Sequence, residues 1–295
     1  MLIAHLSDAH IGPLPPVLLH ELLNKRLTGF INWKRGRSRT HDMPLLSRLL
    51  ADIGSHRPDH IAMTGDIVNI GLAGEFPLAR AFLEQLGAPG HVSFVPGNHD
   101  AYVRAALAPM RHWLGPWMTG DGAAASRFPY VRQRDGVALI GLSSGVPTLP
   151  FLASGTLGTA QLAAFADILA DLGRAGLCRV VMVHHPPHLG GAKPGRGLTD
   201  AAEFERTVAR AGAEIILHGH NHKTSLATIP GPGGSAVPIL GAPSVSAVSG
   251  THDHRAGYHL LHIVPDGARS AISLTTRGHD PQTGAIATIG ERTIR

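Results

Sequence analysis

The sequence contains one cysteine in 295 residues, few aromatic side chains and no long hydrophobic run. A lone Cys178 can form neither an internal disulfide nor a thiolate cage, so any bound metal must be held by nitrogen and oxygen. No stretch reaches the roughly 18 consecutive apolar residues of a membrane-spanning helix, and the first residues lack the basic and apolar regions of a signal peptide. We therefore expect a cytoplasmic protein, with peripheral attachment to a membrane left open.

Charged residues are also scarce, at 16% of the chain, and they are unevenly placed. The net charge is +5, and six basic residues fall between Glu21 and Asp42 with no acid among them: Lys25, Arg26, Lys34, Arg35, Arg37 and Arg39. Such a patch favours an anionic substrate or partner. Because few aromatic residues are interleaved with it, a nucleic-acid partner is disfavoured. The composition does not indicate an oligomeric state.

Histidine, by contrast, is abundant, with 20 in the chain. Histidine is the commonest metal ligand and the proton carrier of neutral pH, so this excess favours a metal site. Short apolar runs alternate with helix-like stretches along the chain and predict an α/β fold, with mostly strands in the last third. The periodicity weakens after Gly278. We therefore expect one domain over residues 1–277 and a loosely ordered C-terminal tail over residues 278–295.

Five of the predicted strands stop abruptly at Gly, Asp, Asn or His. Ligands of open α/β sheets bind beyond the carboxyl ends of the strands, so five such ends indicate one shared site. Side chains at i and i+2 of an extended segment point the same way, so D-x-H and H-x-H each present two ligands to one pocket. Glycines ahead of Asp66, Asn98 and His220 allow sharp turns. Two carboxylates, one amide and four imidazoles suit two transition-metal ions, with Asp66 central enough to bridge them.

The segments "SDAHIG", "TGDIVNIG", "PGNHD", "VHHPP" and "HGHNH" resemble, in this order, the motifs of the calcineurin-like metallophosphoesterase superfamily. The resemblance covers residues 7–222. It implies an α/β protein with a four-layer α/β/β/α sandwich of two facing mixed sheets and a dinuclear centre. The resemblance assigns Asp8, His10 and His222 to one metal, Asn98, His184 and His220 to the other, and Asp66 as the bridge.

The same resemblance implies a chemistry. A hydroxide that bridges two metals attacks phosphorus, and His99 assists the leaving group, while Asp100 orients either His99 or the turn. Mixed Asp, Asn and His ligands accept Fe, Mn, Zn or Co, as divalent or mixed-valence ions. We therefore expect a dinuclear metal-dependent phosphoesterase, a hydrolase that acts on a small-molecule phosphoester.

Two departures from the motifs narrow this expectation. Asn69 stands where the serine/threonine protein phosphatases of the superfamily carry an aspartate, and the Arg-Gly that follows it there is absent. His99 stands where the lipid A precursor hydrolases carry an arginine. The form resembles the bacterial branch with cyclic-nucleotide and glycerophosphodiester phosphodiesterases, so we expect a phosphodiesterase. The alternatives are a phosphomonoesterase, a lipid-headgroup phosphohydrolase and, behind these, a non-catalytic scaffold on the same fold.

In "VHHPPH", neighbouring residues at a strand end point in opposite directions, so His184 and His185 cannot both face one metal. The family pattern selects His184 and leaves His185 as a residue that either supports the ligands from behind or packs in the interior. His188 follows two prolines and is expected at the substrate entrance or in solvent.

Residues 13–42, here called the basic segment, form an insertion between the first two motifs. Leu19, Leu22, Leu23, Leu27, Phe30 and Ile31 recur in it at helical spacing. One interpretation is a helix packed on the body with a solvated basic rim. The other is a cap or membrane-surface helix beside the metal centre, with a contact to an anionic lipid surface left open.

Overall fold

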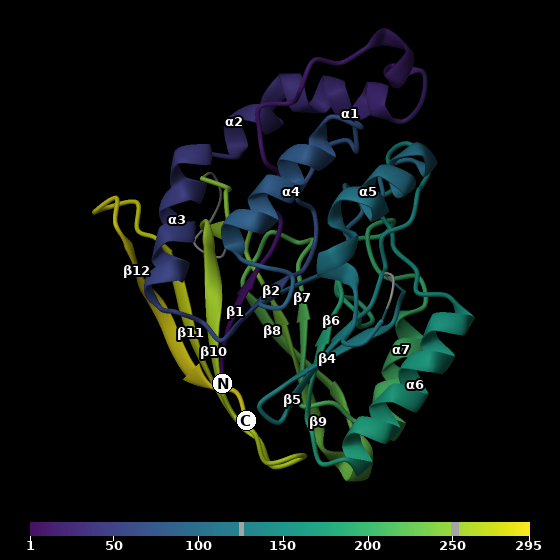
Figure 1. The fold of residues 1–295 in the computed structure, drawn as a ribbon, viewed down its shortest axis with the longest axis vertical. Coiled ribbons are helices and arrows are strands. Elements are labelled where there is room, and N and C mark those ends of the chain that lie inside the picture. Colours follow the sequence, from purple (N-terminus) through teal and green to yellow (C-terminus); the bar gives the residue numbers. More distant parts are fainter. Residues whose placement is uncertain (124–126, 249–253) are drawn as a thin grey trace.

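Two six-stranded mixed sheets pack face to face, and helices cover their outer faces (Figure 1). This arrangement confirms the expected α/β/β/α sandwich. The structure is a computed structural model that describes residues 1–123, 127–248 and 254–295. Among these residues, none of the helices combines the length and the apolar character that a bilayer crossing requires.

The first sheet has the strand order β12-β11-β10-β1-β2-β3. Its strands are β1 (Leu2–Leu6), β2 (His60–Met63), β3 (Val92–Phe94), β10 (Gly257–Val264), β11 (Ala271–His279) and β12 (Ile286–Thr293). Strands β1, β2 and β3 run parallel, and β10, β11 and β12 join them as an antiparallel extension. The carboxyl ends of β1, β2 and β3 therefore lie at one edge of the sheet.

The second sheet has the order β4-β5-β6-β7-β9-β8. Its strands are β4 (Tyr130–Arg134), β5 (Val137–Gly141), β6 (Cys178–Met182), β7 (Ile215–His218), β8 (Ser225–Pro230) and β9 (Ala236–Gly241). The four central strands run parallel, and β4 and β8 close the edges as antiparallel strands. The β8–β9 pair turns at residues 232–234, within the "PGPGGS" stretch.

Helices on the two outer faces complete the layers. They are α3 (Met43–Ser55), α4 (Glu75–Leu86) and α5 (Leu107–Leu114) beside the first sheet, and α6 (Thr159–Arg174) and α7 (Ala201–Ala211) beside the second (Figure 1). The Asp42 side chain caps α3 by accepting a hydrogen bond from the Leu45 N–H. Phe165 of α6 and Phe204 of α7 are buried and stack with ring centroids 5.4 Å apart. The outer helices thus bury their apolar faces against the sheets.

Two elements depart from the sequence-based expectation. Helix α7 interrupts the last third, which was expected to be mostly strand. The expected loose order after Gly278 is also wrong for residues 286–293, because β12 pairs with β11 along the sheet edge. Most residues of β12 are exposed or only half-buried, since an edge strand has one neighbour. Its sequence therefore lacks the apolar alternation that would have predicted a strand.

The ends of β2 and β3 are tied together by the carboxylate of Asp100. This fully buried group accepts hydrogen bonds from the backbone N–H groups of Asp66, Ile67, Val68 and Gly97, at 2.7 to 3.2 Å. The sequence left two roles open for Asp100, and its contacts are those of the turn-binding role. A buried N–H without an acceptor costs free energy, so one side chain stabilises both turns.

We expect Asp100→Ala to lower the free energy of unfolding by about 3 kcal/mol or more, because it leaves four buried donors without an acceptor. Urea unfolding followed by circular dichroism measures this change. Asp171→Ala is the matched control, since Asp171 is exposed and pairs with Arg174 on the surface of α6. The control should change stability by less than about 0.5 kcal/mol. Equal losses in the two variants would contradict this role of Asp100.

Candidate metal centre

All seven side chains that the sequence predicts as metal ligands lie together, where the carboxyl ends of the strands of both sheets meet. Asp8 follows β1, Asp66 follows β2 and Asn98 follows β3, all in the first sheet. From the second sheet, His184 follows β6 and His220 follows β7. The two sheets therefore share one site, which forms only when they pack against each other.

The first group contains Asp8, His10 and His222. The His222 Nε2 atom lies 3.2 Å from Asp8 Oδ1 and 3.2 Å from His10 Nε2. Asp8 and His10 are fully buried, while His222 borders the cavity described below. Two imidazole nitrogens and a carboxylate oxygen thus converge on one point.

The second group contains Asn98, His184 and His220. Asn98 Oδ1 lies 2.9 Å from His220 Nδ1 and 3.3 Å from His184 Nε2, and the two nitrogens are 3.3 Å apart. The other ring nitrogen of His220, Nε2, is buried and has no hydrogen-bond partner in the described structure. This nitrogen is not the one that faces Asn98 and His184. In the first group, however, the buried Asp8 Oδ1, which lies 3.2 Å from His222 Nε2, also has no hydrogen-bond partner among the described residues, and a metal ion between these donors would remove the cost of leaving it unpaired.

Asp66 lies between the two groups. Its Oδ2 atom is 3.2 Å from His184 Nε2 in the second group and 4.0 Å from His10 Nε2 in the first. Its Oδ1 atom accepts a hydrogen bond from the His99 N–H at 2.7 Å, which fixes the carboxylate in this direction. Asp66 is thus the side chain that faces both groups.

Backbone carbonyls orient two of the histidine rings. His184 Nδ1 lies 2.7 Å from the Thr64 carbonyl oxygen, and His10 Nδ1 lies 3.1 Å from that of Val68. A ring that bonds to a carbonyl through Nδ1 directs Nε2 toward the centre, and Nε2 is the nitrogen that binds metal once it carries no proton. The donors therefore fit a transition-metal centre with nitrogen and oxygen ligands.

The backbone at this site is held in an unusual conformation. Five of the seven predicted ligands have a positive φ, between 40° and 70°: Asp8, His10, Asp66, His220 and His222. Non-glycine residues rarely adopt the left-handed region, and such strain collects at functional sites. We expected glycine to provide the sharp turns, but only Gly65 of the three preceding glycines has a positive φ. Gly97 is needed for another reason, because a Cβ there would overlap the Asp66 carboxylate.

The buried charges at the centre interact strongly. Burial would raise the pKa of Asp66, but His184 and His99 beside it outweigh this effect and hold the pKa well below its usual range. Burial would lower the pKa of His184, and the same ion pair instead raises it to about 9. Asp8 responds in the same way to His222, which lowers its pKa against the effect of burial. Two ionised carboxylates in a buried site favour a cation between them.

His99 and Arg37 face each other beside the first group. The ring of His99 points Nδ1 at the Asn69 carbonyl oxygen, and its Nε2 lies 2.9 Å from Arg37 Nη1. Arg37 Nη2 lies 2.9 Å from His10 Nε2. The side chain of Asn69 does not bond to His99, because its Nδ2 donates to the Ile11 carbonyl oxygen. The guanidinium thus joins His99 to one of the predicted ligands.

Sequence reasoning missed Arg37 and His41 as individual site residues. Both come from the basic segment, where Arg37 counted only as one of six cations. The His41 ring lies 4.7 Å from that of His10 between centroids, and its Nδ1 is 2.7 Å from Ser246 Oγ. No motif or spacing marks either residue, because the course of the segment over the site depends on contacts with distant parts of the chain.

The neighbours of His184 have different surroundings. Both ring nitrogens of His185 are engaged by the protein, Nδ1 at 2.7 Å from Ser144 Oγ and Nε2 at 3.1 Å from the Ala153 carbonyl oxygen. These bonds fit the packing role that the sequence indicated for His185. His188 is half-buried, and its Nδ1 lies near the carbonyl oxygen of Leu189.

A cavity of about 750 Å³ opens over the centre. Asp66, Asn98 and His220 lie at its floor, and four basic residues line its walls: Arg37, Lys193, Arg196 and Lys223. A cavity with cations on its walls and polar groups at its floor suits an anionic small molecule.

Comparisons with known proteins agree with this geometry. Residues 1–224 match the model of the calcineurin-like phosphoesterase family. A probable cyclic nucleotide phosphodiesterase of Synechococcus sp. is 29% identical over 234 residues, which cover 78% of this chain and 82% of that protein. The glycerophosphodiester phosphodiesterase GpdQ of Enterobacter lignolyticus is 29% identical over 234 residues, or 77% of this chain and 72% of that protein.

A solved structure shares the fold. The crystal structure of a dimetal phosphatase from Danio rerio matches with a TM-score of 0.61 and 13% identity, over 99% of this chain and 98% of that one. At this identity the match concerns the architecture of the two sheets and their helices.

We expect His184→Ala to remove most of the bound metal, because it deletes a nitrogen that faces both Asp66 and Asn98. His185→Ala should keep more metal but unfold more readily, since it leaves the Ala153 carbonyl without its partner and removes one of the hydrogen bonds of Ser144 Oγ. His188→Ala should change neither. Metal content by inductively coupled plasma mass spectrometry and urea unfolding test this order. Equal metal loss in the first two variants would contradict it.

Proposed function

Because the chain belongs to the calcineurin-like phosphoesterase family, we propose that it hydrolyses phosphodiesters at a centre of two metal ions. The observation that carries this proposal is the sharing of Asp66 between two groups of nitrogen and oxygen donors. As a member of this family the chain is a phosphoric ester hydrolase, a metallophosphoesterase. The two curated relatives are named as phosphodiesterases, which supports a diester as substrate.

The proposed ligands follow the two groups. Asp8, His10 and His222 would hold one metal, Asn98, His184 and His220 would hold the other, and Asp66 would contribute to both. When bound, the metals supply Lewis acidity toward the phosphate oxygens and lower the pKa of a water. The donor set accepts Fe, Mn, Zn or Co.

His99 is proposed to donate a proton to the leaving oxygen. In the structure its pKa is lowered to about 3, first by burial and then by the charge of Arg37, so the ring is neutral before substrate binds. A bound phosphate carries negative charge and would raise this pKa, because an adjacent anion favours the imidazolium. The carbonyl of Asn69 keeps Nδ1 occupied, so the proton would leave from Nε2.

Arg37 is proposed to bind the phosphate of the substrate. Its guanidinium lines the cavity and lies within hydrogen-bond distance of His10 and His99. A guanidinium is permanently charged and can donate two parallel hydrogen bonds to phosphate oxygens, which an ammonium group cannot do. The basic segment would thereby contribute one substrate-binding residue to the site.

Two other functions, a phosphomonoesterase and a non-catalytic scaffold, can be distinguished from a phosphodiesterase. A phosphomonoesterase would favour p-nitrophenyl phosphate over bis(p-nitrophenyl) phosphate, whereas we expect the diester to have the higher kcat/KM. A scaffold on this fold would be expected to lack some ligand side chains, and the chain has all seven. The contact with an anionic lipid surface and the peripheral attachment to a membrane remain predictions from the sequence.

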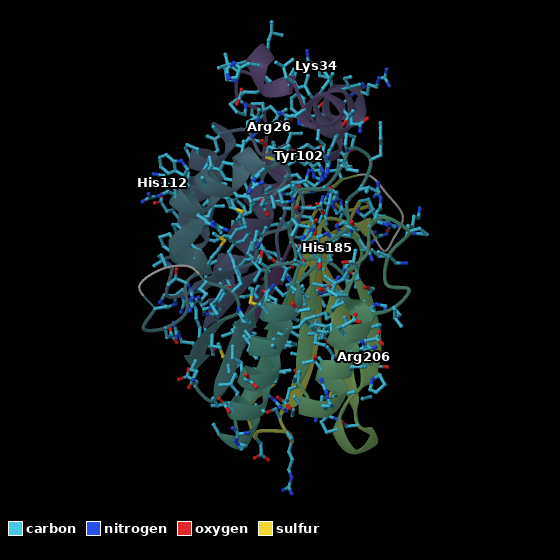
Figure 2. All side chains as sticks on the ribbon, turned by 90° about the vertical axis from the view of Figure 1, so that its right-hand side faces the viewer. Arg26, Lys34, Tyr102, His112, His185 and Arg206 are labelled. Atoms are coloured by element: carbon cyan, nitrogen blue, oxygen red, sulfur yellow. The ribbon has the colours of Figure 1, made fainter. Side chains whose placement is uncertain are left out.

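Asp66→Asn should reduce turnover of bis(p-nitrophenyl) phosphate by at least about a thousandfold, because it removes the charge shared by the two groups. His99→Ala should reduce kcat by about 100-fold to 10,000-fold through loss of the proton donor. Both are measured with Mn²⁺, Zn²⁺ or Co²⁺ added. His112→Ala, on the outer surface (Figure 2), is the control and should keep full activity. Wild-type turnover in a folded, metal-loaded Asp66 or His99 variant would refute the assignment.

Arg37→Ala should raise KM for the diester by about tenfold or more, because it removes a charge-assisted phosphate contact. Arg37→Lys should recover part of the loss, since it restores the charge without the planar fork. Steady-state kinetics measure both variants. Arg206→Ala is the matched control, because Arg206 is exposed on α7 (Figure 2), does not line the cavity and pairs with Glu203. An unchanged KM in Arg37→Ala would count against phosphate binding by this residue.

A further inference from the structure

The basic segment turns its apolar stripe toward solvent. It contains the 3-10 helix η1 (Leu19–Leu22), the helix α1 (Arg26–Asn32), a π-helical turn η2 (Trp33–Arg37) and the short helix α2 (Ser38–Thr40). Leu19 and Leu23 are 84% and 86% exposed, and Leu27 and Ile31, the next residues of the same stripe, are also exposed. A helix at the surface of a globular protein normally does the reverse. The sequence-based interpretation in which the helix packs this stripe on the body is therefore wrong for these four residues, whereas Phe30 of the same stripe does pack against Ile70, Leu72 and Tyr102.

Two buried cations fix the segment in this orientation. Lys25 Nζ donates hydrogen bonds to Thr148 Oγ1 at 2.5 Å and to the Leu152 carbonyl oxygen at 2.8 Å. Arg26 donates to the carbonyl oxygens of Ile70, at 3.2 Å, and Gly71. Figure 2 shows Arg26 between the segment and Tyr102, with Lys34 at the outer side. Because these charged residues bond to the body, the stripe on the opposite side must face outward.

A second set of exposed apolar side chains borders the first. Leu149, Phe151 and Leu152 are exposed on the loop that Lys25 holds, and Phe151 is 86% exposed. Phe151 also has a φ of 68°, a left-handed conformation that is costly for a bulky residue. A large apolar side chain kept both strained and exposed indicates a partner for it.

The third part is the loop that carries Leu189, which is 66% exposed. This loop is joined to the second by a hydrogen bond from the Ala153 N–H to the Gly195 carbonyl oxygen at 3.0 Å. All three parts reach the cavity, through Arg37, Ala153 and Gly190 respectively. The exposed apolar side chains therefore lie around the entrance to the proposed active site.

We call these three parts the docking surface: the basic segment, residues 148–153 and residues 188–197. It carries nine of the thirteen large apolar side chains that are exposed among the described residues. Such a concentration marks an interaction site, whereas single exposed leucines are ordinary.

The charges of the docking surface indicate what it contacts. Lys34, Arg35, Arg39, Lys193 and Arg196 are exposed on it. Glu21 is the only acidic residue within residues 13–41, and residues 148–153 and 188–197 contain none. The docking surface thus combines apolar side chains with basic residues and almost no acid. We therefore expect its partner to offer both an apolar interior and negative charge. An anionic lipid bilayer offers both.

We propose that the docking surface binds an anionic lipid bilayer and that the substrate is a phosphodiester of a lipid headgroup in that bilayer. The apolar side chains enter the boundary between headgroups and acyl chains, and the basic residues meet the lipid phosphates. The cavity then faces the headgroups, with Arg37 and the metal centre behind its entrance. The substrate part of this proposal rests on the proposed phosphodiesterase function, whereas the binding part does not.

The experiment uses sedimentation of the full chain with vesicles of phosphatidylglycerol and phosphatidylcholine, or of phosphatidylcholine alone. Wild type should bind the anionic vesicles, and it should bind them less at high salt. Leu23→Ser with Phe151→Ser should weaken binding by about tenfold or more, because two exposed apolar groups no longer enter the lipid. Lys34→Glu with Arg35→Glu should weaken binding to the anionic vesicles similarly.

Leu226→Ser with Val264→Ser is the matched control, because both side chains are exposed on strands outside the docking surface. It should bind like wild type. All variants should turn over the water-soluble bis(p-nitrophenyl) phosphate at the wild-type rate, which shows that they are folded. The docking variants should lose hydrolysis of phosphatidylglycerol in vesicles, measured as release of the headgroup.

The outcomes separate this inference from the proposed function. If wild type hydrolyses the water-soluble diester but does not bind vesicles, the inference is overturned and the phosphodiesterase function stands. The inference is also overturned if the docking variants still bind vesicles like wild type. It is overturned as well if this surface binds a protein partner and not lipid. If wild type binds vesicles and the docking variants do not, but wild type hydrolyses neither substrate, the docking is supported and the phosphodiesterase function is overturned.

Discussion

Four buried backbone N–H groups, those of Asp66, Ile67, Val68 and Gly97, donate to the carboxylate of Asp100. These bonds hold the turn after β2 against the turn after β3, and they stabilise the left-handed backbone of Asp66. Asp66 in turn faces both groups of proposed ligands. The Asp100 carboxylate, which does not line the cavity, thus determines the position of Asp66, the proposed bridging residue, and the other proposed ligands are arranged around it.

Much of the fold and of the site could be predicted from the sequence, because both are encoded locally. Strands that end at Asp8, Asp66, Asn98, His184 and His220 are visible as apolar runs that stop at polar residues, and parallel strands bring such ends together. The ordered motifs then supply the architecture. The conformational strain was not predictable in the same way, since it lies in the ligand residues themselves and not in the glycines before them.

The parts that sequence reasoning missed depend on distant contacts. The apolar stripe of the basic segment has helical spacing, but spacing does not say which face is buried. Lys25 and Arg26 decide this through bonds to carbonyl groups more than 40 residues away. The same contacts place the segment beside the cavity, where Arg37 enters it. Strand β12 escaped prediction for a related reason, because an edge strand needs no apolar alternation.

Asp8 and His220 meet in the folded centre through a hydrogen bond although they are 212 residues apart in the chain. During synthesis on the ribosome, Asp8 and His10 are therefore made more than 200 residues before His220 and His222. The early part of the chain cannot bring all the proposed ligands together, so any metal held by them would bind after the two sheets have paired. A truncated product that ends before β7 would carry Asp8 and His10 but neither His220 nor His222. Such a fragment would be expected to bind little metal and to have no activity.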